Sequence, residues 1–530
     1  MELPRLIGSA APLAALRGVY TTLILWLAGT QAGKPAPQGL RGVYTALILW
    51  LAGTQAGKPA PHGLRGVCTA LILWLAGGLA WTAPALTSEQ TAWLAKAHRF
   101  ERAGWIYLHS EGGPRERGFQ HGYLLAREIA ENLRVTRRLW TYGSSMEWTW
   151  LLDQTSPFLE PRVDSENLAE LDGLVEGLKA AGVESSRREM MVFNAWFELD
   201  WYWWPKELKK LKDGPSPAVK QSCSSFIATG SATADGGVVL GHNSMVDYPE
   251  AYFNVVMDLQ PATGHRILMQ TAPGWIHSGT DFFVTDAGLV GSETTIGDFT
   301  GYDEKGVPEF ARARRAMQDA HSIADWCAIM RQGNNGGYAN AWLIGDVNSR
   351  EIARLELGLK YDRLEKSRDG YFLGSNIAED PKVLRLETES NENDVRLSSI
   401  ARRARWQHLM ARYAGKINLS LAKRFEADHF DSFFRRERAG GRTLCGHYEL
   451  DDQYWGAWPG APVFPAGTFD AKVLDTKLAK GMSFAARWGA ACGKAFDAPK
   501  FLAAHPQFDW MKDILRSRPS QPWVVFRAGE

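Results

Sequence analysis

The spacing of hydrophobic residues divides this chain of 530 residues into a helical part and a strand-rich part. Apolar residues recur at helical spacing in 115–134, 168–182 and 188–204, and a strand is predicted before them at 104–112. From residue 223 onward the pattern changes to short apolar runs joined by glycine turns. Strand segments are predicted there, in the order of the sequence, at 223–232, 238–245, 251–260, 265–272, 281–295 and 341–357; the last segment is a pair of strands with a turn at Asn348.

Helices are predicted again between the last two of these strands, from about 308 to 332. Strands that follow one another in a block, with helices before and between the blocks, are typical of layered α+β domains. Proteins built from alternating parallel units show strand and helix in strict alternation instead. The pattern therefore predicts an α+β fold.

The first 85 residues carry a tandem repeat that ends in a predicted export signal. A unit of 24 residues starts at Leu16, recurs from Leu40 and begins again at Leu64. Each apolar run is shorter than the roughly 20 residues that span a bilayer. The third copy leads into Ala83-Pro84-Ala85, which has the form of a signal-peptidase site. We interpret 1–85 as a repeated signal-peptide-like segment of a secreted or periplasmic protein; the alternative is a membrane anchor of several hydrophobic segments.

Composition marks a second boundary inside the remaining chain. Residues 206–222 are rich in Lys, Pro, Ser and Gly and predict an exposed linker that ends directly at Cys223. This gives a mostly helical fragment, 86–222, and a catalytic fragment, 223–530. Lys and Arg number 60 against 59 Asp and Glu, so no nucleic-acid partner is expected. The basic runs 401–406 and 433–442 are predicted to form solvated faces.

Four cysteines follow the predicted export signal. Cys445 and Cys492 could form a disulfide in an oxidising compartment, whereas Cys327 lies in a helical pattern and is predicted to be an inert buried thiol. The sequence Cys445-Gly446-His447 has no second pair at zinc-ligand spacing. We therefore expect no metal and no cofactor.

Cys223 differs from the other cysteines because it opens a predicted strand immediately after the linker, before two serines. If the bond between Ser222 and Cys223 were cut, the residue would gain an α-amino group with a pKa near 8. That amine could serve as the general base for its own thiol. The same thiol could attack the preceding carbonyl and open the chain. The alternative is an ordinary buried cysteine in a strand.

Five sequence blocks place this cysteine in a known context. They are SCSSF at 222–226, GHNS at 241–244, DFFVTDAGLVGSETTI at 281–296, NGGYANAW at 335–342 and HPQFDW at 505–510. In this order they resemble the phospholipase B-like family and, more distantly, the penicillin acyltransferase and choloylglycine hydrolase relatives, all N-terminal-nucleophile (Ntn) hydrolases. The resemblance implies a four-layer αββα fold, with two stacked antiparallel sheets between helices.

The resemblance also implies roles for individual residues. It makes Cys223 the nucleophile, places His242 and Asn243 at the end of the second strand in the same site, and lets Asn340 donate to the developing oxyanion. Four further residues are expected to shape the substrate pocket: Trp275, Glu293, Thr294 and Thr295. Ala339 and Met245 depart from the family's pattern, so the substrate is not fixed by it.

The sequence thus predicts a secreted, self-cleaving Ntn hydrolase whose two fragments stay associated. It would hydrolyse the amide bond, or alternatively the ester bond, of a small-molecule acyl amide or lipid ester, as a phospholipase B-like enzyme. One alternative is a papain-like cysteine hydrolase without self-cleavage that pairs Cys223 with His277 or His447. Another is a non-catalytic secreted lipid-binding protein of the same fold.

Overall fold

The computed structural model of the protein describes residues 86–211, 223–280, 282–453 and 462–530. The repeated segment 1–85, Ser222 and the linker from 212 onward lie outside the described residues. The first part of the predicted linker, 206–211, is not a linker but the end of helix α11 (Trp204–Leu211). Lys and Leu residues at helical spacing continue the aromatic helix there, and the predicted boundary was placed too early.

The larger of two sheets has nine strands and takes strands from both sides of Cys223. Its first two strands, β1 and β2, precede the cysteine in the chain, and β2 pairs with β5 in parallel. Every other pairing among the described strands of this sheet is antiparallel. Its strands in spatial order are β1 (His98–Arg102), β2 (Trp105–Gly112), β5 (Val255–Pro261), β6 (Ile267–Thr271), β7 (Phe283–Thr285), β8 (Leu289–Thr295), β9 (Asn340–Asp346), β10 (Glu351–Leu357) and β11 (Asp362–Ser367).

The second sheet has six strands and begins, in sequence, directly after Cys223. All its pairings are antiparallel. Its strands in spatial order are β12 (Gly370–Gly374), β3 (Ser224–Gly230), β4 (Gly236–Asp247), β15 (Ala466–Asp475), β16 (Ser483–Trp488) and β17 (Val524–Arg527). A small separate ribbon pairs β13 (Phe430–Asp431) with β14 (Arg436–Glu437).

The two sheets stack face to face through a continuous apolar layer. Because side chains alternate between the faces of a strand, Ile227 of β3 joins Val256 and Val290 of the larger sheet in this inner layer. Its neighbours Phe226 and Ala228 point the other way and pack on Trp406 and Phe425. Strand β3 is thus buried on both faces, and its residues from Ser224 to Thr229 are all buried.

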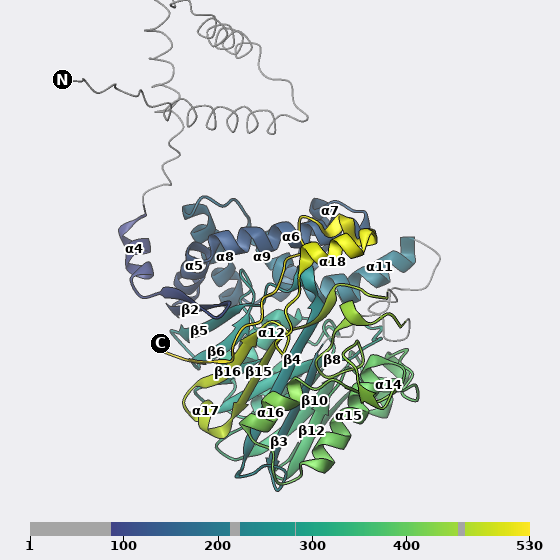
Figure 1. The fold of residues 1–530 in the computed structure, drawn as a ribbon. Helices are drawn as coiled ribbons and strands as arrows, with labels where there is room; N and C mark the ends of the chain where they lie inside the picture. The colour runs from purple at the N-terminus through teal and green to yellow at the C-terminus, as the bar shows by residue number, and fades with distance from the viewer. Residues whose placement is uncertain (1–85, 212–222, 281, 454–461) are drawn as a thin grey trace, which may run out of the picture. The chain divides into compact units, whose positions relative to one another are not determined.

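Helices cover the outer face of each sheet, which completes four layers. Leu171, Met191 and Phe310 of three different helices share one apolar cluster with Val255 of the larger sheet. Helices α15 and α16 cover the smaller sheet, beside β3 and β12 (Figure 1). The predicted α+β class and αββα arrangement are confirmed. The α-helices are α4 (Ser88–Leu94), α5 (Pro114–Leu124), α6 (Ala126–Ser144), α7 (Trp148–Leu159), α8 (Ser165–Ala180), α9 (Arg187–Asn194), α10 (Trp196–Glu198), α11, α12 (Glu309–Asp319), α13 (Ile323–Arg331), α14 (Pro381–Glu387), α15 (Ser398–Arg412), α16 (Leu419–Glu426), α17 (Thr476–Lys480) and α18 (Ala498–Ala504).

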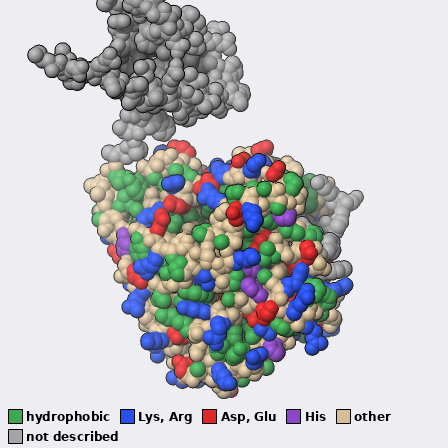
Figure 2. Space-filling view, in the orientation of Figure 1, with side chains coloured by type: hydrophobic (Ala, Val, Ile, Leu, Met, Phe, Trp, Pro, Cys, Tyr) green, Lys and Arg blue, Asp and Glu red, His purple; other side chains and the backbone are tan. Residues whose placement is uncertain are grey.

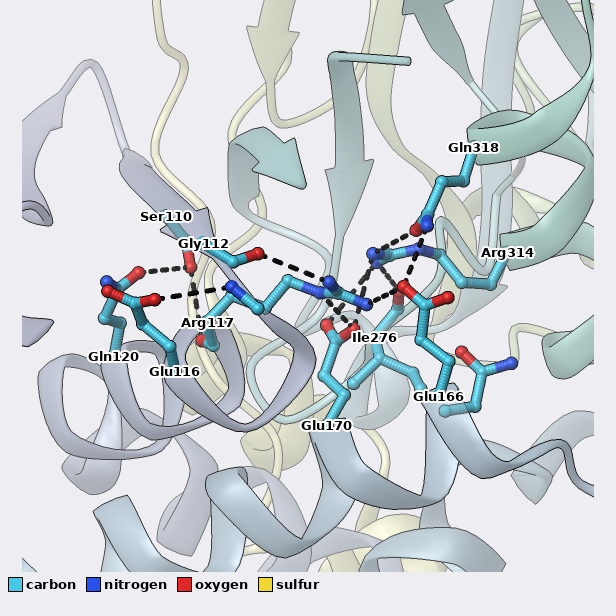
Figure 3. Close-up of polar contacts among 12 residues, drawn as sticks. Ser110, Gly112, Glu116, Arg117, Gln120, Glu166, Glu170, Ile276, Arg314 and Gln318 are labelled. Carbon is cyan, nitrogen blue, oxygen red and sulfur yellow. Dashed lines mark hydrogen bonds and ion pairs between the residues drawn. The ribbon is translucent and has the colours of Figure 1, made fainter. Parts of the chain in front are cut away.

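A buried ion network joins the helices before Cys223 to those after it (Figure 3). Arg117 of α5 binds Glu170 of α8, with Nε and Oε2 2.6 Å apart. Arg314 of α12 approaches the same carboxylate, with Nη2 and Oε2 3.3 Å apart, and donates to the carbonyl of Ile276. Gln318 closes the network by donating to Glu166 at 2.8 Å. Three charged side chains that would be costly to bury alone therefore satisfy one another.

The surface carries no preference for one sign of charge on the face drawn in Figure 2, where basic and acidic side chains are mixed. This agrees with the near balance of charges in the sequence. Among the helices that the structure describes, none is long and apolar enough to cross a membrane.

Candidate active site

Cys223 lies at the entrance to β3, with 3% of its surface exposed. Its backbone φ is +93°, a conformation that glycine adopts freely and that strains a residue with a side chain. The strand that follows is fixed on both faces and paired on both edges, so the strain cannot relax by moving β3. Cys223, the residue directly before β3, therefore carries backbone strain.

The Cys223 thiol faces a buried carboxylate and an imidazole. Sγ lies 3.5 Å from Oε1 of Glu293 on β8, and the hydroxyl of Tyr338 donates to the same oxygen at 3.1 Å. One ring nitrogen of His242 belongs to the same group, in which the thiol, the imidazole and the carboxylate lie within 4.8 Å of one another. The structure thus brings together Cys223, His242 and Glu293 from three different strands or strand ends.

Burial keeps all three groups in their neutral forms. It raises the pKa of the Cys223 thiol well above its usual value, and the nearby Glu293 adds to this effect. Burial likewise raises the pKa of the Glu293 carboxyl to about 8. It lowers the pKa of His242 well below its usual value, with a further contribution from the Lys472 ammonium. The thiol needs a neighbouring base before it can act as a nucleophile.

Arg402 holds the backbone of Cys223 by a hydrogen bond. Its guanidinium donates to the carbonyl of Cys223 and, at 2.8 Å, to Oδ1 of Asn376. Asn376 in turn donates to the carbonyl of Thr295 at 2.7 Å. The prediction that the run 401–406 forms a solvated face was wrong for Arg402, which is fully buried. Trp406 of the same run donates to Oγ of Ser224 at 2.9 Å.

Asn340 occupies the first position of β9, opposite Thr295 of β8. Its side chain is fully buried, and neither its amide nitrogen nor its oxygen has a hydrogen-bond partner in the structure. An unpaired buried amide costs roughly 1–3 kcal/mol and is unusual in a folded protein. Such a group is available to bind a substrate atom, although its predicted role at the oxyanion stays a prediction.

His242 and Asn243 do not share one side of β4. His242 takes part in the group around the thiol, and both its ring nitrogens are buried without a partner. The Asn243 amide nitrogen instead donates to the carbonyls of Glu426 and Leu444 at 2.7 and 2.9 Å. Adjacent residues of a strand point to opposite faces, which explains why the two side chains have different partners. Asn243 anchors α16 and the loop at 444; its role at the thiol stays a prediction.

Of the predicted pocket residues, Trp275 forms part of a buried aromatic wall. Trp275 packs edge-on against Phe197, with ring centroids 5.1 Å apart, and Phe197 lies 5.5 Å from Tyr338. Tyr338 links this wall to the thiol through Glu293. Of the tryptophan-rich segment 201–204, Trp201 lies nearest, 5.9 Å from the Tyr338 ring. Thr294 and Thr295 are buried in β8 beside Glu293.

Several residues of the site were not predicted from the sequence. Tyr338 stands inside the NGGYANAW block, which was a signal that could have identified it. Arg402 gave no such signal because an exposed and a buried arginine look alike in sequence. Ser292 and Ser225 join the two sheets below the site, with their hydroxyl oxygens 2.7 Å apart. Their pairing depends on the stacking of sheets, which periodicity does not reveal.

The histidines of the papain-like alternative lie elsewhere. His277 stacks on Trp275 and faces Glu309 at 3.9 Å. His447 lies beside Cys445 and Cys492, which are free thiols in the structure and do not form the predicted disulfide. His429 completes this second group, which the fold brings together although the sequence has no second pair at zinc-ligand spacing; the expectation of no metal stays a prediction. The two further residues are far away in the sequence: His429 lies 16 residues before Cys445, and Cys492 lies 45 residues after His447. A rule based on local ligand spacing does not detect them.

Comparison with protein families confirms the resemblance over part of the chain. Residues 165–358 match the family described as Phospholipase B, and this segment contains Cys223, His242, Glu293 and Asn340. An uncharacterized protein of Archaeoglobus fulgidus is 25% identical over 272 residues, which is 49% of this chain and 44% of that protein. The putative phospholipase B-like 2 of Rattus norvegicus is 36% identical over 92 residues, 16% of each chain. The similarity therefore covers less than half the length of these relatives.

Two solved structures match part of this chain at low similarity. A mutant conjugated bile acid hydrolase from Clostridium perfringens matches with a TM-score of 0.32 and 11% identity, over 50% of this chain and 89% of that one. Penicillin V acylase from Agrobacterium tumefaciens matches with a TM-score of 0.29 and 13% identity, over 50% and 83%. Likenesses this remote carry no argument about activity.

Proposed function

Because residues 165–358 of this chain match the family described as Phospholipase B, we propose that the protein is a self-cleaving cysteine hydrolase. Its nucleophile would be Cys223, freed as a new N-terminus by cleavage after Ser222. The observation that carries the proposal is the place of the thiol. It lies within 4.8 Å of a carboxylate and an imidazole, on the residue directly before a buried strand.

Self-cleavage would proceed by transfer of an acyl group within the chain. The Cys223 thiol loses its proton to a neighbouring base and attacks the carbonyl carbon of Ser222. The carbon–nitrogen bond then breaks, the nitrogen takes up a proton, and a thioester links Ser222 to the Cys223 sulfur. Water hydrolyses this thioester and leaves a free carboxylate on Ser222 and a free amine on Cys223. The strained φ of Cys223 favours this step because cutting the bond before it releases the strain.

Turnover would use the same thiol with the new amine as its base. An amine with a pKa near 8 can accept the thiol proton at neutral pH, which a buried thiol cannot lose alone. The thiolate attacks the substrate carbonyl, and the unpaired Asn340 amide would donate to the oxyanion. The amine returns its proton to the leaving group. Water then hydrolyses the acyl-enzyme and restores the thiol.

We propose an amide as the preferred bond and a lipid ester as the alternative, since a cysteine thiolate attacks both. The aromatic wall around Trp275 and Phe197 favours an apolar acyl group. A secreted or periplasmic location is part of the proposal and follows from the sequence of residues 1–85 alone. The papain-like alternative is disfavoured because His277 and His447 contact other groups than the Cys223 thiol.

The proposal is tested by the N-termini of the purified protein. We expect the wild type to yield two polypeptides on a denaturing gel, the smaller N-terminal one ending at Ser222 and the other beginning at Cys223. Cys223→Ala should remain a single chain and should not hydrolyse acyl amides or phospholipids. Cys327→Ala serves as the control, because that thiol is buried in α13 away from the site.

Two outcomes would contradict the proposal in different ways. An uncut wild type that still hydrolyses substrate would exclude the amine as base and favour the papain-like alternative. An uncut wild type that hydrolyses none of these substrates, and whose Cys223 does not react with a thiol-directed acyl probe, would favour a non-catalytic binding protein.

A further inference from the structure

A second group of potential ligands lies outside the segment that matches the Phospholipase B family. His429, Cys445, His447 and Cys492 each point one nitrogen or sulfur atom into a common space, and these atoms all lie within 4.8 Å of one another. They come from three segments: the residue directly before β13, a loop at 445–447, and the loop that follows β16. Two thiols and two imidazoles are the ligand set that favours Zn²⁺.

The distances among these atoms suit a tetrahedral metal site. Nε2 of His447 lies 3.4 Å from Sγ of Cys445 and 3.4 Å from Sγ of Cys492. Zinc bonds of about 2.3 Å to sulfur and 2.0–2.1 Å to nitrogen place such ligands roughly 3.6 Å apart in a tetrahedron. Nε2 of His429 is buried and has no hydrogen-bond partner. The group thus contains a fourth ligand atom that nothing else in the described structure occupies.

The surrounding contacts orient these ligands as a metal would require. Nδ1 of His447 lies 2.8 Å from Oε1 of Glu449, which leaves Nε2 free to bind. Tyr248 donates to the other oxygen of Glu449 at 2.9 Å and so fixes the carboxylate. The backbone nitrogen of Lys494 donates to Sγ of Cys492 at 3.4 Å, which stabilises a thiolate. A carboxylate behind a histidine and a donor to a sulfur are typical outer contacts of metal sites.

We propose that His429, Cys445, His447 and Cys492 bind one Zn²⁺ ion. Four protein ligands leave no position for water, so the site is structural and not catalytic. The ion would join three segments of the chain: the residue before β13, the loop at 445–447 and the loop that follows β16. One of them, the loop at 444, is the loop to which the Asn243 amide donates. Zinc would thereby fix the support of β4 directly beside His242.

The rival for these residues is a disulfide between Cys445 and Cys492. A disulfide would use the two sulfurs and leave the buried Nε2 of His429 without a partner. It would also give no role to the Glu449 carboxylate that orients His447. Zinc binding explains all four side chains together, which is why we favour it.

The test is the metal content of the purified full chain, measured by mass spectrometry of the elements. We expect about one zinc per chain in the wild type and at least a tenfold loss in Cys492→Ala and His429→Ala. Glu449→Gln keeps all four ligands and should weaken zinc binding by about 10- to 100-fold, measured by competition with a chelator. Cys327→Ala and Cys223→Ala should keep their zinc, so this test is independent of turnover and of self-cleavage.

A measurement on the wild type covers the case in which the variants do not fold. After removal of zinc with a chelator, Co²⁺ should give the visible and thiolate charge-transfer absorption of a tetrahedral site. Alkylation of the untreated protein under denaturing, non-reducing conditions then reports the state of Cys445 and Cys492. A protein that holds no zinc and gives no such cobalt spectrum overturns the proposal, whether these two cysteines are joined or free.

Discussion

At the scale of single residues, burial decides the charge state of the site. Cys223, His242 and Glu293 are all buried, and the pKa of each is displaced toward its neutral form. A neutral thiol beside a neutral carboxyl is a resting arrangement and not an active one. The proposed activity needs a base for the thiol, and the α-amine of a cleaved Cys223 would be such a group.

The raised pKa of Glu293 has a measurable consequence for stability. Its carboxyl titrates at about 8 in the folded chain and near 4.5 when exposed, so the folded state holds an extra proton between these values. The contribution of Glu293 to the free energy of unfolding should therefore be greatest below pH 4.5. It should fall by up to about 1.4 kcal/mol per pH unit as the pH rises toward 8. Glu293→Gln removes the titrating group and with it this contribution.

The effect of Glu293→Gln is best measured in the Cys223→Ala background, which keeps the chain uncut, by comparing Cys223→Ala with the double variant that carries both substitutions. The thermal midpoint of the background protein should fall more steeply between pH 5 and pH 8 than that of the double variant. Glu89→Gln, at an exposed position in α4, is the control and should leave the slope unchanged. If the difference between the two proteins stayed constant across this range, Glu293 would not hold the proton assigned to it.

The sequence identified those residues of the site that stand in distinctive blocks. Cys223, His242, Glu293 and Asn340 all lie in such blocks, and the structure brings the first three together. It could not identify partners that depend on distant contacts. Arg402 reaches the Cys223 carbonyl from a helix 179 residues further along the chain, and nothing in a run of arginines marks one of them as buried.

At the scale of elements, hydrophobic periodicity located the strands that are buried on at least one face. The segments from 223 to 295 are strands as predicted because their apolar residues are continuous or alternate. Strand β11, DRLEKS, is polar and largely exposed at the edge of the larger sheet, so it carries no such signal. The order of strands was not predictable either. Strand β3 pairs with β12, some 140 residues later, through backbone contacts that no pattern records.

The packing of α5 on α8 depends on glycines that let the two backbones approach. A β-carbon on Gly118 would lie 2.0 Å from the carbonyl oxygen of Glu170, a contact that backbone cannot avoid by a rotamer change. Gly118→Ala should therefore force the helices apart and destabilise the protein by about 1–3 kcal/mol. Gly143 near the end of α6 has open space around it, and Gly143→Ala should be neutral or slightly stabilising. Thermal midpoints of the two variants, measured at the same pH, check this; equal midpoints would contradict it.

At the scale of the whole molecule, the fragments on either side of the proposed cut share one fold. Strands β1 and β2 belong to the N-terminal fragment yet form one edge of the nine-stranded sheet, where β2 pairs with β5 in parallel. The helices of the same fragment lie in one core cluster with that sheet. Cleavage before Cys223 would thus leave two chains with a common sheet and a common core. This supports the proposal that the fragments stay associated.

The buried network of Arg117, Glu170 and Arg314 offers a direct test of that association, because Arg314 lies in the C-terminal fragment and its partners in the N-terminal one. Removing Arg314 takes one of the two guanidinium groups from the buried Glu170 carboxylate and leaves the buried Ile276 carbonyl without this donor, at a cost of about 1–3 kcal/mol. With a tag on the C-terminal fragment, Arg314→Leu should therefore release the N-terminal fragment at a lower urea concentration than the wild type. Arg315→Leu is the matched control: its neighbouring guanidinium is 45% exposed and faces Asp319 at 3.8 Å, so its loss should cost less than about 1 kcal/mol. In the uncut Cys223→Ala chain no fragment can be released, and Arg314→Leu should only lower the thermal midpoint more than Arg315→Leu does. This second measurement shows whether the ion network stabilises the protein even if the wild type is not cleaved. If Arg314→Leu and Arg315→Leu behaved alike in both measurements, the shared sheet alone would hold the fragments together.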